Sequence, residues 1–454
     1  MNRLELIIYD RVKNNPELKR HIVRLYQRVC SPFPMNRLEL FVYNQVRNNP
    51  RLKRRIVHLY QWLCGLVPQK SIVGGDNLVV RPGYFVGFHD KIPFSGDNSL
   101  LLAHRNLIGN RSVRPGDQTE IGVFSGAGWK SWSSLGRTSA WDWQLGCMLQ
   151  WRGKAAREIV FNDIVDGVIG SRVITSSGQP VASYRIPVVH VSPDGELASS
   201  YCFRRLNRGM PGYGVRIAGD EDAPLHDFRC ADPDGFRVFS LEDGKVRFEI
   251  TLEQIRRIEP EDSMEGAFHY FHHSLFNPSG TRLFFFHRWV DRTHMRWTRM
   301  FACNPDGSRL FRFPTHEVVS HVGWIDERRL IAYARTAEQG DGYYIFRDGE
   351  PRWERVAGQW FNSDGHPMWS PSGDGFVTDS YPDRFRNQGL YLVDLERNRA
   401  SRIVRTHLSR AFLDDLQVDL HPRFDRRGRT VCFDSGHLGE RALCTVDVRP
   451  QVAA

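Results

Sequence analysis

The sequence contains no apolar run that approaches the roughly 18 residues needed for a membrane-spanning helix. Its first residues, MNRLELIIYDRV, carry Glu5 and Asp10 inside their apolar stretch and make a poor secretory signal. The eight cysteines are scattered and form no Cys-x-x-Cys pair. This spacing disfavours a zinc ribbon or a disulfide framework and predicts reduced thiols in a cytoplasmic protein.

Acidic residues are scarce only near the N-terminus. Residues 1–70 hold 14 Lys and Arg against 4 Asp and Glu, a net charge of +10. Subtracting these from the 62 basic and 52 acidic residues of the chain leaves 48 of each sign for the rest. The main body is therefore neutral overall, and its net charge gives no reason to expect a polyanionic binding partner. We expect no nucleic-acid partner, because the basic segment lacks a recognised reading element.

The basic segment is a duplication. Residues 1–30 recur at 35–64 with most positions identical, and each copy reads as a helix, an Asn-Asn-Pro break and a second helix. We predict tandem helical hairpins over residues 1–70, because Pro16 and Pro50 are suited to the first position of the second helices. Their basic face is suited to peripheral contact with anionic lipid or with a protein. A solvated basic face on a segment packed against the body explains the pattern equally well.

From about residue 80, short strands rich in aromatic and β-branched residues replace the helical pattern. One unit recurs: an aromatic or apolar residue, a polar residue, a Pro or Gly turn, and a second strand. It occurs at 94–104, 151–161, 191–201, 276–287, 324–334, 369–379 and 424–434. Propeller blades span roughly this repeat length. We therefore predict a mainly β fold, a seven-bladed β-propeller over residues 71–454. We expect an enlargement at 203–273 and place a similar unit at 303–313 in the fifth blade.

Histidines recur at one position of this unit. His273, His321, His366 and His421 each lie four residues before the turn of their unit. The first strand of a blade lines the central channel, so these imidazoles should lie at one mouth of it. The returning second strands end at the same mouth, and His89 precedes the first unit. The ends of these second strands place His104, Tyr201, His287 and Asp379 at that mouth as well.

Two explanations stand for these histidines. Any single one is well explained as a hydrogen-bonding residue that links neighbouring blades. The set favours a site, because ligand chemistry benefits from one residue type at one mouth in four blades.

The turn units resemble those of TolB-type propellers. The stretches FHHSLFNPSGTRLFFFHRW, HEVVSHVGW and DGHPMWSPSGDGFVTDSYPD are similar to propeller polysaccharide lyases, namely ulvan lyases and, more distantly, oligogalacturonate lyase. The resemblance covers roughly residues 80–445 and implies β-elimination at a uronic acid. That reaction needs a neutralised carboxylate, a base for the C5 proton and an acid for the leaving oxygen. By motif position the catalytic candidates are His89, His104, Tyr201, Tyr213 and Arg216.

The resemblance also implies a metal near the fourth-blade unit. The Cys-x-His expected there is Phe285 and His287 in this sequence, and loss of the thiolate would weaken such a site. If a cofactor is bound, we expect a divalent ion, zinc or manganese. The candidate metal ligands are His273, His287, His321 and His366. The candidates for contact with an acidic polysaccharide or oligosaccharide are His272, Arg288 and His421.

Two other functions remain open at this point. A non-catalytic propeller that binds glycan, or that acts as a scaffold in bacterial polysaccharide assembly, would have the same fold, since fold does not fix function. A glycoside hydrolase would need two carboxylates across the channel mouth. Asp364, Asp379 and Asp383 lie near the right level, but they read more easily as turn and strand-end residues. We expect a cytoplasmic protein, with the basic segment as its means of membrane association.

Overall fold

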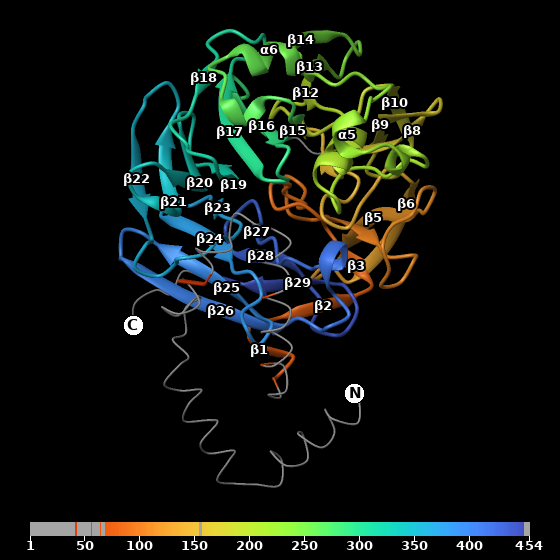
Figure 1. The fold of residues 1–454 in the computed structure, drawn as a ribbon. Coiled ribbons are helices and arrows are strands. Elements are labelled where there is room, and N and C mark those ends of the chain that lie inside the picture. The colour runs from red at the N-terminus through yellow and green to blue at the C-terminus, as the bar shows by residue number, and fades with distance from the viewer. Residues whose placement is uncertain (1–40, 43–55, 57–63, 65–68, 154–156, 449–454) are drawn as a thin grey trace, which may run out of the picture.

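Seven β-sheets are arranged in a ring, as predicted (Figure 1). The computed structural model describes residues 41–42, 56, 64, 69–153 and 157–448. The predicted hairpins of residues 1–70 therefore lie almost entirely outside the described residues. No helix in the described part of the chain is long and apolar enough to cross a membrane.

The strands follow one another from the channel outward. In the first three blades they are β3 (Tyr84–Phe85), β4 (Leu101–Arg105), β5 (Thr119–Ser125), β6 (Ser131–Thr138); β7 (Gln150–Trp151), β8 (Glu158–Val165), β9 (Val168–Thr175), β10 (Pro180–Tyr184); and β11 (His190–Val191), β12 (Leu197–Ser200), β13 (Phe236–Ser240), β14 (Val246–Ile250). In the fourth and fifth they are β15 (Phe268–Phe276), β16 (Leu283–Val290), β17 (Arg296–Cys303), β18 (Phe311–Arg312); and β19 (Val319–Trp324), β20 (Arg329–Thr336), β21 (Gly340–Arg347), β22 (Trp353–Val356). In the last two they are β23 (Met368–Trp369), β24 (Gly375–Asp379), β25 (Asn387–Asp394), β26 (Arg399–His407); and β27 (Arg423–Phe424), β28 (Thr430–Ser435), β29 (Ala442–Asp447).

The N-terminal end of the described chain closes the ring. Strand β2 (Val79–Pro82) pairs with β29 as the outermost strand of the seventh blade, and β1 (Ile72–Gly74) pairs with β26 in the sixth. Figure 1 shows these two orange strands beside the blue C-terminal blades. Backbone hydrogen bonds thus join the N-terminal end of the described chain to the two C-terminal blades.

The recurring turns share one backbone hydrogen bond. The glycine amide donates to the residue three positions earlier in Gly195→Ser192, Gly280→Asn277, Gly373→Ser370 and Gly428→Asp425. Each of these glycines has a positive φ, which suits a residue without a Cβ. The turn chemistry therefore explains the repeat that predicted the blades.

Blade faces pack against each other, so strands are buried on both sides. Every residue of β16, LFFFHRWV, is buried. Phe284 and Phe286 of the fourth blade pack with Ala332 and Tyr344 of the fifth. Such strands read as continuous apolar runs, since neither face meets water.

The enlargement predicted at 203–273 is present in the third blade. Between β12 and β13 lies a segment, residues 203–235, that we call the insertion; it holds α5 (Phe203–Gly209), η1 (Asp220–Asp222) and η2 (Leu225–Asp227). α6 (Leu252–Arg257) and η3 (Asp262–Met264) follow β14, and η4 (Asp414–Leu416) precedes β27. The unit at 303–313 was misplaced by one blade: it joins β17 to β18 in the outer hairpin of the fourth.

Candidate active site

A loop from the first blade carries His89 into the channel. The Val86 and Gly87 amides donate to the Asp434 carboxylate at 2.8 and 3.0 Å, which ties the loop to the seventh blade. Gly87 has φ +101°, and a Cβ there would lie 2.8 Å from the backbone of the 145–146 peptide. Only glycine fits this crossing, so the loop places His89 at one defined point.

Six imidazoles meet around that point. We call them the histidine cluster: His89, His272, His273, His321, His366 and His421. The ring centroids lie 4.0 Å apart for His321–His366, 4.3 Å for His366–His421 and 4.4 Å for His272–His273. His89 lies 5.2 to 6.1 Å from the rings of His273, His321, His366 and His421. No member is more than 5% exposed. The structure thus brings together the four histidines that the repeat aligned.

Irregular backbone turns these side chains inward. The pairing of β15 with β16 shifts between His272 and Ser274, and that of β19 with β20 shifts between Val319 and Val322. His273 has φ +49° and His421 φ +45°. A non-glycine residue held in this region costs on the order of 1–3 kcal/mol and is enriched at functional sites. The strain at two cluster members points to a role beyond packing.

Hydrogen bonds fix the proton position on several rings. His366 Nδ1–H donates to Asp379 Oδ1 at 2.7 Å, and His421 Nδ1–H donates to the Gly87 carbonyl at 2.7 Å. In their neutral forms both rings then keep the Nε2 lone pair free. Nε2 of His89, His272, His273, His366 and His421 is buried without a hydrogen-bond partner in the described part of the chain. Buried polar atoms are seldom left in this state, which suggests a ligand.

Electrostatics keep most of the cluster neutral. Burial lowers the pKa of His89, His272, His273 and His421 well below its ordinary value, and the other positive groups nearby add to this effect. Burial also lowers the pKa of His321. For His366, burial acts in the same direction, but the Asp379 charge and hydrogen bond outweigh it and raise the pKa. Lone pairs are therefore available at most of these rings near neutral pH.

Two carboxylates position the imidazoles. Asp379 Oδ1 accepts from the His366 amide and ring, and Oδ2 accepts from the His421 amide at 3.0 Å. Asp364 Oδ1 accepts from His321 Nδ1 at 3.2 Å and from the Gly365 amide. Carboxylates occupied in this way do not suit the acid and nucleophile of a glycosidase.

One part of the cluster has the composition of a metal site. Ligand atoms of His366, Asp419 and His421 all lie within 4.8 Å of one another. Asp419 is buried, which raises its carboxyl pKa, and it accepts from Gln417 at 2.7 Å. Sequence reasoning missed Asp419 and placed His421 with the substrate; the Asp-x-His spacing was the available signal.

His287 does not join this group. Its Nδ1 accepts from Arg299 at 3.1 Å, and its Nε2 lies 2.9 Å from His269 Nδ1. His287 thus belongs to a separate polar contact between β16 and its neighbours, whereas His273 and His321 are in the cluster.

The other predicted residues divide into near and distant ones. Arg288 donates to His272 Nδ1 at 2.8 Å. The ring of Tyr213 lies 5.6 Å from that of His272, and the ring of Tyr201 lies 6.4 Å from it. Burial raises the pKa of both tyrosines, so their hydroxyls stay protonated. These three residues flank the cluster.

His104 and Arg216 have other surroundings. His104 stacks on Phe85 at 4.8 Å, and its Nε2 lies 3.1 Å from Cys147 Sγ. Arg216 donates to the Val113 carbonyl at 3.2 Å and lines a small cavity with Asp415. None of these contacts involves the histidine cluster, and the catalytic role of both residues stays a prediction.

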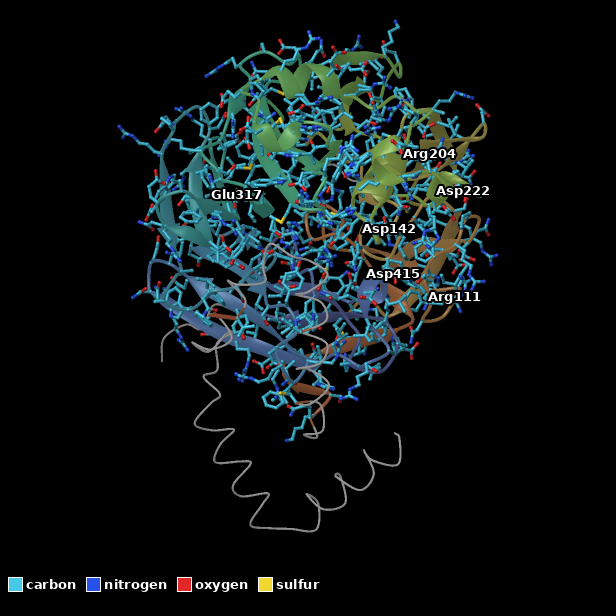
Figure 2. All side chains as sticks on the ribbon, viewed as in Figure 1. Arg111, Asp142, Arg204, Asp222, Glu317 and Asp415 are labelled. Carbon is cyan, nitrogen blue, oxygen red and sulfur yellow. The ribbon has the colours of Figure 1, made fainter. Side chains whose placement is uncertain are left out.

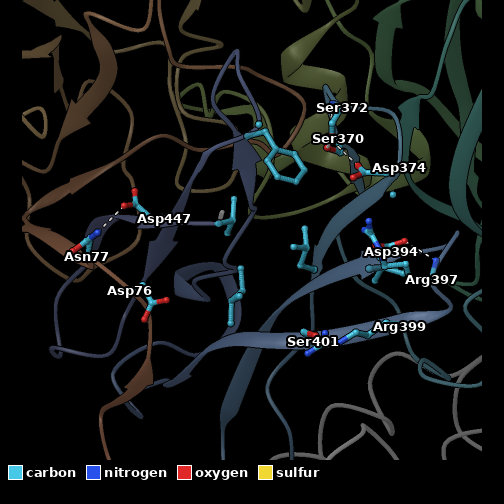
Figure 3. A pocket seen from close by; sticks show the side chains of 17 residues that line it. Asp76, Asn77, Ser370, Ser372, Asp374, Asp394, Arg397, Arg399, Ser401 and Asp447 are labelled. Carbon is cyan, nitrogen blue, oxygen red and sulfur yellow. Dashed lines mark hydrogen bonds and ion pairs between the residues drawn. The ribbon is translucent and has the colours of Figure 1, made fainter. Parts of the chain in front are cut away.

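The channel is open at the end opposite to the one expected. A cavity of about 610 Å³ lies among the inter-strand turns and reaches His89, Asp90 and Lys91 from that side. At the histidine end the rings are covered by side chains that include Tyr213 of the insertion. A second cavity, of about 530 Å³, lies where Asp76 and Asn77 meet the sixth and seventh blades (Figure 3). It contains none of the cluster.

The fold and its buried imidazole cluster define a seven-bladed propeller with a candidate ligand site on its axis. No protein-family model and no curated protein matches the chain. An oligogalacturonate lyase in complex with manganese aligns with a TM-score of 0.55 at 15% identity, over 85% of this chain and 97% of that one. An oligogalacturonate lyase from Vibrio parahaemolyticus aligns with a TM-score of 0.54 at 15% identity, over 85% and 99%. TolB from Acinetobacter baumannii aligns with a TM-score of 0.36 at 11% identity, over 75% and 78%.

At this identity the likeness to the two lyases establishes the fold alone. The predicted resemblance to oligogalacturonate lyase thus holds at the level of structure, while the resemblance to ulvan lyases stays a prediction.

Proposed function

We propose that the protein is a lyase that cleaves uronic-acid-containing saccharides by β-elimination at the histidine cluster. The observation that carries the proposal is the set of five buried imidazole Nε2 atoms without partners around one channel axis. A purely structural cluster would pair its donors and acceptors, whereas a ligand would satisfy them. The shared fold with oligogalacturonate lyase supports this reaction class.

The donor set fits a divalent metal ion. His366 and His421 direct Nδ1–H to a carboxylate and to a carbonyl, which leaves Nε2 as the ligand atom, and Asp419 adds an oxygen. Such outer hydrogen bonds are typical of metal-binding histidines. When bound there, zinc or manganese would neutralise the uronate carboxylate and acidify the C5 proton.

The remaining steps use groups of this chain. Arg288, fixed by its bond to His272, supplies positive charge beside the substrate carboxylate. His89 takes the C5 proton, since its lowered pKa keeps the ring neutral. The Tyr213 hydroxyl protonates the departing glycosidic oxygen. In this proposal the insertion opens to admit the substrate at the histidine end, where Tyr213 covers the rings and the imidazoles are at most 5% exposed.

Ultraviolet absorbance tests the proposal, because elimination creates an unsaturated uronate. We expect absorbance to rise when the protein, loaded with Mn²⁺ or Zn²⁺, is incubated with oligogalacturonates and a panel of other uronate polymers. His89→Gln should abolish the increase, whereas His316→Gln, at an exposed histidine, should not. Binding on a glycan array without any absorbance change would replace the lyase by a glycan-binding propeller.

A further inference from the structure

Two cysteines meet at the base of the insertion. Cys202 follows β12 and caps the start of α5, where its sulfur accepts from the Arg205 amide. Cys230 lies at the other end of the insertion, before β13. Their sulfurs are 3.1 Å apart, and among the described cysteines they are the two whose sulfurs are in contact. The contact therefore joins the two ends of a single segment.

The two thiols are not equivalent. Cys202 is 7% exposed, whereas Cys230 is partly exposed. The contact with Cys202 lowers the pKa of Cys230, and the same contact together with burial raises the pKa of Cys202. A partly exposed thiol of lowered pKa beside a buried partner is the arrangement of an attacking and a resolving cysteine.

We propose that Cys202 and Cys230 are a thiol–disulfide site that small disulfides such as oxidised glutathione oxidise. The Cys230 thiolate attacks one sulfur of glutathione disulfide, forms a mixed disulfide and releases one glutathione thiolate. Cys202, after losing its proton, attacks the Cys230 sulfur and releases the second glutathione. The protein pair loses two electrons and two protons, which the glutathione disulfide takes up as two thiols.

The bond would lock the covering segment of the histidine cluster. Within the insertion, Arg205 Nε donates to the His269 carbonyl at 2.6 Å, and Met210 Sδ accepts from Arg288 at 3.3 Å. Arg204, labelled on α5 in Figure 2, forms a two-fold ion pair with Asp220 of the same segment. A disulfide between residues 202 and 230 closes the insertion into a loop and disfavours its opening. A disulfide that keeps the insertion closed would also slow the lyase reaction, and this consequence rests on the proposed function. Formation of the disulfide itself does not depend on that function.

A metal is the rival ligand for the same atoms. Ligand atoms of Cys202, Cys230 and Asp232 lie within 4.8 Å of one another. A structural zinc site needs four protein ligands, however, and Asp232 lies 3.5 Å from Arg204. This carboxylate has a cationic partner already, which favours the disulfide.

Peptide mapping tests the site in the full-length protein. After equilibration in buffers of rising oxidised-to-reduced glutathione ratio and alkylation of remaining thiols, we expect a Cys202–Cys230 linked peptide that dithiothreitol removes. Cys202→Ser should trap glutathione on Cys230, whereas Cys230→Ser should leave Cys202 unmodified. A Cys30→Ser/Cys64→Ser background controls for thiols outside the pair. The proposal would be overturned if no linked peptide formed at any glutathione ratio. It would also be overturned if the protein held one equivalent of zinc that the Cys230→Ser variant lost. The first result comes from the wild-type protein alone and does not depend on the folding of a variant.

Limited trypsin digestion measures the locking. Oxidation should slow cleavage within residues 203–230 about tenfold or more, because cleavage follows the open population, and Cys230→Ser should abolish the difference. Equal cleavage rates in both states would overturn the locking step. A linked peptide in a protein without lyase activity would leave the thiol site standing and remove only the proposed function.

Discussion

Asp379→Asn tests whether this carboxylate holds two blades in register at the candidate site. In the native protein it accepts from the His366 amide and ring and from the His421 amide. An asparagine side chain keeps one accepting oxygen and turns an NH₂ group toward the other partner. At least one buried donor then loses its acceptor, in a site where Asp379 is 2% exposed.

The size of the effect follows from these contacts. A hydrogen bond to a charged group contributes about 1.5–3 kcal/mol, and an unsatisfied buried donor costs about 1–3 kcal/mol. The three contacts share one carboxylate and do not add fully, so we expect a loss of about 3–5 kcal/mol in the free energy of unfolding.

The loss should depend on pH with a defined sign. His366 has a folded-state pKa above its unfolded value because of Asp379. Its contribution to stability is therefore complete below the unfolded pKa, about 6.5, and is lost as pH rises through the folded-state pKa. The difference between wild type and Asp379→Asn should be larger near pH 6 than near pH 9. The other cluster histidines are present in both proteins, so their contributions to the pH dependence of unfolding largely cancel in the difference.

Urea unfolding of both proteins across this pH range measures the difference. Asp374→Asn is the matched control, because it makes the same change at a partly exposed turn of the same blade, and we expect less than about 0.5 kcal/mol there. A loss for Asp379→Asn that is equally small, or one that does not vary with pH, would refute the proposed coupling to His366.

Three further predictions address the site and its support. His421→Ala should weaken Mn²⁺ or Zn²⁺ binding in calorimetry by at least about tenfold, whereas His287→Ala, outside the group, should not; equal affinities would contradict the ligand assignment. Tyr213→Phe should keep the thermal midpoint and lower the lyase rate about 10²–10⁴-fold; an unchanged rate would exclude this hydroxyl as the acid. Gly87→Ala should lower the thermal midpoint more than Gly116→Ala, because both have positive φ but only Gly87 has backbone within 3 Å of the new Cβ; equal shifts would argue against a tight crossing.

The repeat predicted the blades and one level of the site for the same reason. Each turn fixes the register of its own innermost strand, so equal offsets from equivalent turns give equal heights along the channel. His273, His321, His366 and His421 follow this rule. His287 and His104 contact other residues instead: His287 lies against His269 and Arg299 of its own blade, and His104 against Phe85 and Cys147. Their position on second strands does not explain this, because Arg288 and Asp379 also lie on second strands and contact the cluster. The sequence therefore predicted how far along the channel axis a histidine lies. It did not predict the direction in which its side chain points.

Two other features depend on contacts that the repeat does not encode. Asp419 precedes its blade outside any strand, and it meets His366 only because the sixth and seventh blades are adjacent. The covering of the cluster depends on how the insertion folds back, through contacts such as Arg205 with the His269 carbonyl. Sequence separation is large in both cases, so local pattern carries no signal for them.

The burial of the cluster bears directly on the choice between a structural and a chemical role. An imidazole with a structural role alone would use both ring nitrogens, as His287 does with His269 and Arg299 inside the fourth blade. In the cluster, five rings leave Nε2 without a partner in the described part of the chain. Two of the same residues, His273 and His421, also hold positive φ. A fold selected for stability alone gains nothing from either cost, whereas a ligand that binds several lone pairs at once offsets both.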